Sequence, residues 1–117
     1  MNNGQDNSVD SLVKTTLDAL DAPVERLKFT GEADTFIVFY LVNADDDDFA
    51  DDEPTTHEHL YRIDFFSKGN YMALLKQARQ ALKTAGFYGN SINAEFYESS
   101  TGYNRISLDS NYLEVFL

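Results

Sequence analysis

The segment Phe36–Val42 (FIVFYLV) is apolar at every position, and seven carboxylates in nine residues follow from Asp45 to Glu53. Its length and its β-branched and aromatic side chains predict a β-strand. Because apolar residues do not alternate with polar ones, both faces of this strand should be covered, one by helices and the other by a partner. A second strand is predicted at Thr56–Ser67. The two strands should form a long antiparallel hairpin with the acidic run as a loop at its tip.

The second strand has two distinct faces, because successive side chains of a strand point in opposite directions. One set of residues is expected to face the core: His59, Tyr61, Ile63 and Phe65. The other set should point away from it: Leu60, Arg62, Asp64 and Phe66.

Two helices are predicted from apolar residues at spacings of three and four. The first begins at Ser8 and ends before Pro23, with an apolar face of Val9, Leu12, Val13, Leu17 and Leu20. The second spans about residues 69–85, with an apolar face of Tyr71, Leu74, Leu75, Ala78, Leu82 and Ala85. Gly86 follows it at the position where a left-handed residue commonly ends a helix.

Three further strands are predicted at Ser91–Ser99, Tyr103–Asp109 and Asn111–Leu117, with turns at Gly102 and at Asp109–Asn111. Residues 26–34 are expected to be a connector. The fold class is therefore α+β: an antiparallel sheet of four to five strands with a long β-hairpin, packed by two helices on one face. Residues 1–7 should form a disordered tail, and residues 8–117 a single domain.

The formal net charge is −11, which disfavours direct nucleic-acid binding, because phosphate neutralisation needs clustered lysine and arginine. The chain has no cysteine, so disulfides and thiolate metal sites are excluded. The polar N-terminus does not resemble a signal peptide. No apolar run approaches the roughly 20 residues that a membrane helix needs.

The acidic run could bind a hard cation, remain a solvated loop, or face a partner. It lacks the glycine and the final glutamate of an EF-hand calcium loop. His57 and His59 have a spacing that suits two nitrogen ligands of a metal, but no cysteine or third histidine completes a site. No nucleophile elbow or glycine-rich phosphate loop is present. We therefore expect no enzyme activity, no cofactor and no specific metal site.

Nine phenylalanines and seven tyrosines are more aromatic residues than one small core needs. Tyrosine and phenylalanine are enriched in protein–protein interfaces. Two readings are therefore open: all of these residues pack in the core, or some of them contact another subunit.

The stretch HLYRIDFFSKGNYMALLKQARQALKTAGF (residues 59–87) resembles small tail proteins of long-tailed bacteriophages and their prophages. In these proteins a strand ending in two apolar residues and serine leads through a Lys-Gly-Asn turn into a helix ending in Ala-Gly-Phe. The following stretch, NAEFYESSTGYNRISLDSNYLEV, is similar to the hairpin that comes next in that group. The resemblance is to the tail terminator, or tail completion and minor tail component, group, and it covers the chain from about residue 9 to its end.

This resemblance implies a homo-oligomeric ring, expected to be a hexamer, at the head-proximal end of the tail tube. The ring would stop tube polymerisation and join the head, with the tail tube protein and the head-connector proteins as partners. The protein would reside in the virion tail after assembly in the host cytoplasm. DNA would pass by without specific binding, and no membrane is involved. The resemblance transfers no catalytic residue.

Two groups of residues would serve this function. The acidic channel or partner loop consists of Asp45, Asp46, Asp47, Asp48, Asp51, Asp52 and Glu53. The subunit interface is expected to include Phe36, Val38, Tyr40, Leu60, Arg62 and Phe66.

The alternative function is an acidic mimic of DNA that inhibits a DNA-binding or restriction protein. A mimic needs carboxylates spread at phosphate-like spacing, whereas over a third of them lie in one run here. A bacterial protein that acts alone with the same fold is a third reading. A ring in solution favours the tail function, and a monomer or dimer favours the mimic.

Overall fold

The structure, a computed structural model, describes residues 8–50 and 53–115; for 45–50 and 53–55 it describes the backbone but not the side chains. The expected disordered tail and the acidic residues Asp51 and Asp52 lie outside the described residues. The elements follow in the order α1 (Ser8–Asp18), β1 (Val24–Arg26), β2 (Thr35–Ala50), β3 (Glu53–Ser67), α2 (Met72–Thr84), β4 (Tyr88–Glu98) and β5 (Tyr103–Val115).

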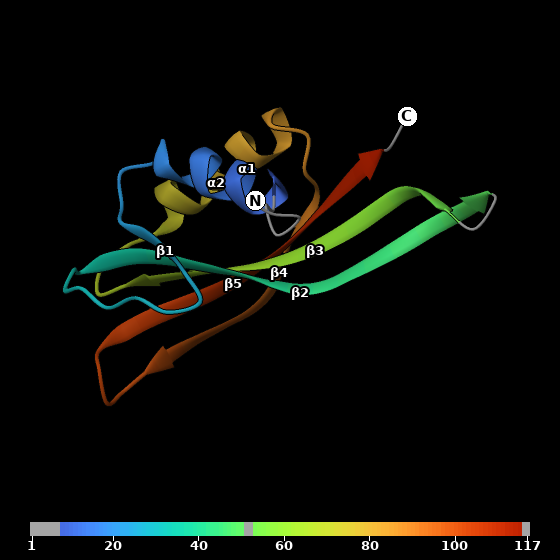
Figure 1. The fold of residues 1–117 in the computed structure, drawn as a ribbon. Helices are drawn as coiled ribbons and strands as arrows, with labels where there is room; N and C mark the ends of the chain where they lie inside the picture. Colours follow the sequence, from blue (N-terminus) through green and yellow to red (C-terminus); the bar gives the residue numbers. More distant parts are fainter. Residues whose placement is uncertain (1–7, 51–52, 116–117) are drawn as a thin grey trace.

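The five strands form one sheet in the order β1-β2-β3-β5-β4. Both helices lie on the same face of this sheet (Figure 1), and the predicted α+β class is confirmed. The prediction of a purely antiparallel sheet is wrong, because β1 pairs in parallel with β2 while the other neighbours are antiparallel. The sequence did not indicate β1, since three residues are too few to show an alternating pattern.

The core lies between the helices and the sheet. The predicted apolar faces of both helices are buried or partly buried, and the core-facing set of β3 is buried as predicted. The buried apolar residues are Val9, Val13, Leu17, Val24, Ile37, Phe39, Tyr61, Ile63, Phe65, Tyr71, Leu75, Ala78, Leu82, Phe87, Ile106 and Leu108. Gly86 follows α2 with a φ of 102°, and Gly102 forms the β4–β5 turn with a φ of 82°, both as expected. Neither described helix is long and apolar enough to cross a membrane.

The β1–β2 connection, residues 27–34, crosses the sheet face opposite to the helices. Because the two strands run in parallel, the chain leaves β1 level with Phe39 of β2 and must return to the start of that strand at Thr35. On the way, the ring of Phe29 stacks on Phe36 with centroids 4.3 Å apart. Val38 beneath the connection is only 6% exposed. Phe36 and Tyr40 remain partly exposed, so the chain itself supplies only part of the cover that the sequence led us to expect from a partner.

The acidic run is a pair of strand ends rather than the predicted loop. β2 continues to Ala50 and β3 begins at Glu53, with backbone pairs from Asp45–Glu58 to Ala50–Glu53. The buried part of the hairpin sets the register, and each further pair satisfies backbone groups of both strands. The pairing therefore continues as far as Ala50 and Glu53. The expected place of the acidic run, at the tip of a long hairpin, is confirmed.

β5 is a single strand, so the turn predicted at Asp109–Asn111 is wrong. Ser110 is fully buried, and its hydroxyl donates to Asn90 Oδ1 at 2.6 Å. Asp109 pairs with Arg62 of β3, with 2.8 Å between Nε and Oδ1. Serine and aspartate favour turns because their side chains bond to the nearby backbone, and here cross-strand partners take up those bonds instead.

Candidate functional site

The sheet face without helices, which we call the open face, carries all six residues predicted as a subunit interface. The strand register and the alternation of side chains place them there. Phe36, Tyr40, Leu60, Arg62 and Phe66 are partly exposed, and Val38 is buried. The open face also includes side chains that were not singled out from the sequence: Leu27, Phe29, Phe96, Tyr103, Arg105 and Ser107.

An aromatic cluster lies at one end of the open face. The rings of Phe36 and Phe66 stack with centroids 4.7 Å apart, and Phe29 stacks on the outer side of Phe36. Tyr103 of β5 meets Phe36 edge-on at 5.3 Å. Its hydroxyl donates to the carbonyl oxygen of Ala33 at 2.6 Å, which attaches the β1–β2 connection to β5. The cluster is therefore a fixed apolar surface and not a set of loose side chains.

A buried carboxylate organises the polar part of the open face. Asp64 is only 4% exposed and accepts a hydrogen bond from the hydroxyl of Ser107 at 2.6 Å. A guanidinium nitrogen of Arg105 lies 3.3 Å from the other carboxylate oxygen. The guanidinium also lies over the rings of Phe96 and Phe66, 4.8 and 5.5 Å from their centroids. Arg105 thus links the carboxylate to the aromatic cluster.

A second ion pair joins β3 to β5. Arg62 donates to both carboxylate oxygens of Asp109, at 2.8 and 3.3 Å, and Asn93 donates to Oδ2 at 3.0 Å. The hydrogen bond to Asp109 holds the pKa of Arg62 above its usual range. The hydrogen bond from Arg62, with that from Asn93, holds the pKa of Asp109 below its usual range against the effect of burial. The four charges of the two pairs balance, so they leave no net charge on the open face.

The open face is shallow. A groove of about 420 Å³ lies between the β1–β2 connection and the strands, lined among others by Lys28, Tyr40 and Arg105. Serine hydroxyls in the sheet serve structural bonds: Ser67 bonds to Thr35 at 2.8 Å, and Ser107 to Asp64. An aromatic surface with balanced charges is typical of a protein–protein contact.

The hairpin of β2 and β3 extends beyond the helices (Figure 1), and the molecule measures 52 × 29 × 24 Å. The structure places the backbone of Asp45–Asp48 and Glu53 at this tip. His57 and His59 stack at 4.5 Å, and His59 Nε2 lies 3.2 Å from a carboxylate oxygen of Glu114 on β5. Among the side chains that the structure describes, no group of three or more histidine, aspartate or glutamate residues could hold a metal ion.

The strand side chains of the open face were predictable from the sequence, whereas the contribution of the β1–β2 connection was not. The alternation of Ile106 and Leu108, both buried, implies that Arg105 and Ser107 point the other way, so this signal was present in the sequence. The contribution of Phe29 was not predictable, because it depends on the return path of the β1–β2 connection.

No protein-family model matches this chain, and no curated protein matches it.

Proposed function

We infer that this chain is a structural protein that assembles into a closed ring, the tail terminator of a long-tailed phage or prophage. In this role the ring, a hexamer, sits on the head-proximal end of the tail tube, stops tube polymerisation and joins the head. The resemblance of residues 59–87 to this group suggests the role, and the shape and surface of the fold support it.

The observation that carries the proposal is the open face. The helices cover only one face of the sheet, and the other presents a fixed aromatic cluster with two internally balanced ion pairs. Desolvating a charge without its partner is costly, whereas these charges already have partners within the subunit. A neighbouring subunit can therefore cover the aromatic residues without burying an unpaired charge from either pair.

The sheet edges also suit a closed assembly. β1 has only three residues, and β4 carries two register shifts, so neither of these two strands offers a long regular ladder for added strands. Strand addition at β1 and β4 is thereby disfavoured. Contact through the open face and the hairpin joins different surfaces of two subunits, and such contacts close into rings when the rotation allows it.

The DNA-mimic alternative is favoured by the net charge of −11. It requires free carboxylates over a broad surface. In the described residues several carboxylates are instead tied to cations: Asp10 to Arg26 at 2.8 Å and Asp18 to Lys14 at 2.7 Å, besides the two pairs of the open face. The ring is therefore the better-supported function.

Sedimentation velocity across a range of protein concentrations tests the proposal, followed by electron microscopy of any oligomer. We expect closed rings, and we expect the protein to cap tubes of a tail tube protein encoded beside it. Phe96→Ser should weaken assembly, because Phe96 is 45% exposed on the open face. Tyr97→Ser is the matched control, since Tyr97 is 61% exposed on the opposite face of the same strand.

A protein that stays monomeric at every concentration, leaves tube growth unchanged and binds a DNA-processing enzyme would contradict the ring and support the mimic. Equal loss of assembly in both variants would instead contradict the assignment of the open face.

A further inference from the structure

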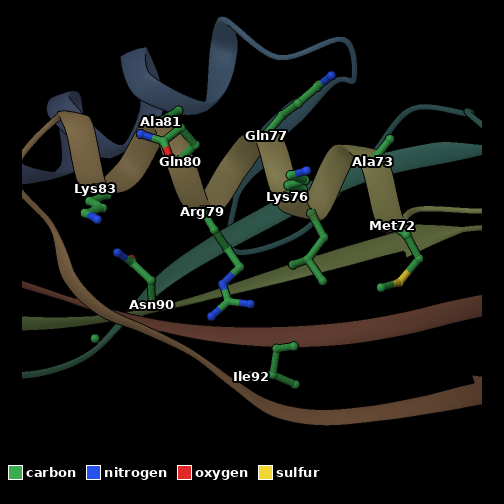
Figure 2. A pocket seen from close by; sticks show the side chains of 12 residues that line it. Met72, Ala73, Lys76, Gln77, Arg79, Gln80, Ala81, Lys83, Asn90 and Ile92 are labelled. Atoms are coloured by element: carbon green, nitrogen blue, oxygen red, sulfur yellow. The ribbon is translucent and has the colours of Figure 1, made fainter.

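A groove of about 980 Å³ runs between α2 and β4, on the helix-covered side of the sheet (Figure 2). Arg79 and Met72 point from α2 toward the strand, and Ile92 rises from β4 toward the helix. β4 bends beside the helix because its pairing with β5 shifts register between Tyr88 and Ser91 and again after Ile92. The groove therefore lies next to a sheet edge that is not regularly paired.

The bend is built into the backbone. Gly89 has a φ of 84° and Asn90 a φ of 48°, both in the left-handed region. Asn90 is buried, donates to the carbonyl oxygen of Phe87 at 3.2 Å, and accepts from Ser110 at 2.6 Å. These bonds fix the entry to β4, so the groove is a preformed feature of the fold.

The groove combines cations with exposed apolar side chains. Lys76, Arg79 and Lys83 line it, which is three of the nine lysines and arginines of the chain, and none of the carboxylates that the structure describes lines it. None of the three makes an ion pair with another residue that the structure describes. Met72 is 56% exposed and Ile92 46%. The groove thus suits an acidic segment that carries an apolar residue.

The chain itself contains such a segment. Residues Asp45–Glu53 hold seven carboxylates, with Phe49 among them. The backbone of residues 45–50 and of Glu53 lies at the tip of the hairpin, which extends away from α2 along the longest dimension of the molecule, 52 Å (Figure 1). The tip of one subunit is therefore remote from its own groove, and the groove is open to another subunit.

We propose that the α2–β4 groove receives the acidic hairpin tip of a second copy of this chain. This contact rests on the proposed function, because it adds a second head-to-tail link, beside the contact of the open face, to a ring of identical subunits. Tip and groove are different surfaces, so each subunit offers one of each, and repeated contacts close into a ring or continue as a filament. The tips then face neighbouring subunits and do not line a channel.

Complementary charge reversals test the contact. The groove variant is Lys76→Glu with Arg79→Glu, and the tip variant is Asp45, Asp46, Asp47 and Asp48 each changed to Lys. We expect the dissociation constant for self-association of each variant alone to rise at least tenfold, because like charges then meet at the contact. An equimolar mixture of the two should associate again, since each groove then meets a tip of opposite charge.

The control is Lys14→Glu, which changes the net charge by as much as each substitution of the groove variant does, at a residue that does not line the groove. It should associate as the wild type does. Rising salt should weaken wild-type association, because it screens attraction between tip and groove. Tips that crowd around a channel would instead repel one another, and salt would then promote assembly.

The outcomes separate this contact from the proposed function. A groove variant that assembles like the wild type would overturn the contact and leave the ring intact. If the wild type neither assembles nor caps tubes, the ring is overturned, and a labelled peptide of residues 43–56 then probes the groove directly. Binding of the peptide to the wild type but not to the groove variant supports the tip as ligand. A labelled DNA oligonucleotide that binds in its place would overturn it.

Discussion

Raising the pH above 10 should destabilise the fold through one buried tyrosine. Tyr71 precedes α2, and its hydroxyl donates to a carboxylate oxygen of Glu95 on β4. Burial, reinforced by the hydrogen bond and the charge of Glu95, raises the pKa of Tyr71 to about 12. Ionisation would place a second anion beside the carboxylate of Glu95, so the folded state holds this proton more tightly than the unfolded chain does.

The sign and size of the effect follow from this difference. A tyrosine in the unfolded chain has a pKa of about 10, so the stabilisation is complete below pH 10 and is lost as the pH rises toward 12. Each pH unit between the two values corresponds to about 1.4 kcal/mol, and solvent around the exposed Glu95 screens part of the interaction, so we expect a loss of about 2 kcal/mol by pH 12. That is about a fifth of a net stability of about 10 kcal/mol, which lies within the 5–15 kcal/mol typical of a small domain.

Urea unfolding followed by circular dichroism between pH 8 and pH 12 measures this loss. Tyr71→Phe removes the titrating hydroxyl, so between pH 8 and pH 12 the wild type should lose about 2 kcal/mol more unfolding free energy than the variant loses. Tyr97→Phe is the control, because Tyr97 is exposed, and it should follow the wild type. An identical alkaline loss in wild type and Tyr71→Phe would refute the reasoning.

Three further measurements test the fold. Leu82→Ala leaves a cavity in the core and should cost about 2–5 kcal/mol in a urea melt, more than Leu74→Ala at a partly buried site. Gly89→Ala should cost more than Gly102→Ala: both have positive φ, but a Cβ at Gly89 meets Asn111 Nδ2 at 2.7 Å, while nothing lies within 4 Å of one at Gly102. Asp109 has a lowered pKa, so its stabilisation is present above about pH 4 and is lost as the pH falls below that value. Asp109→Asn should therefore unfold with a weaker acid dependence than the wild type does; equal acid dependence would contradict the role of the pair with Arg62.

The sequence by itself determined the parts of the fold that repeat along the chain. The spacing of Val9, Val13 and Leu17 identified the buried face of α1, and the alternation of Tyr61, Ile63 and Phe65 identified the core side of β3. Periodicity reports which face of an element is buried, because burial of apolar surface is the main force that orients it. The same alternation places the six predicted interface residues on the face of the sheet without helices.

Only the tertiary structure decided the features that depend on partners distant in sequence. Ser110 lies within a strand because Asn90 accepts its hydrogen bond, and without that partner the local preference for a turn is the stronger signal. The acidic residues continue β2 because the register set in the core extends outward, which overrides the tendency of like charges to form an open loop.

The candidate surfaces divide along the same line. The open face combines a predictable alternation with Phe29, whose place depends on the return path between two parallel strands. The α2–β4 groove was not predictable, because Arg79 and Ile92 are 13 positions apart and meet only where the helix crosses the bent edge strand. Local sequence determines which side chains an element presents, and the packing of elements determines which of those side chains share a site.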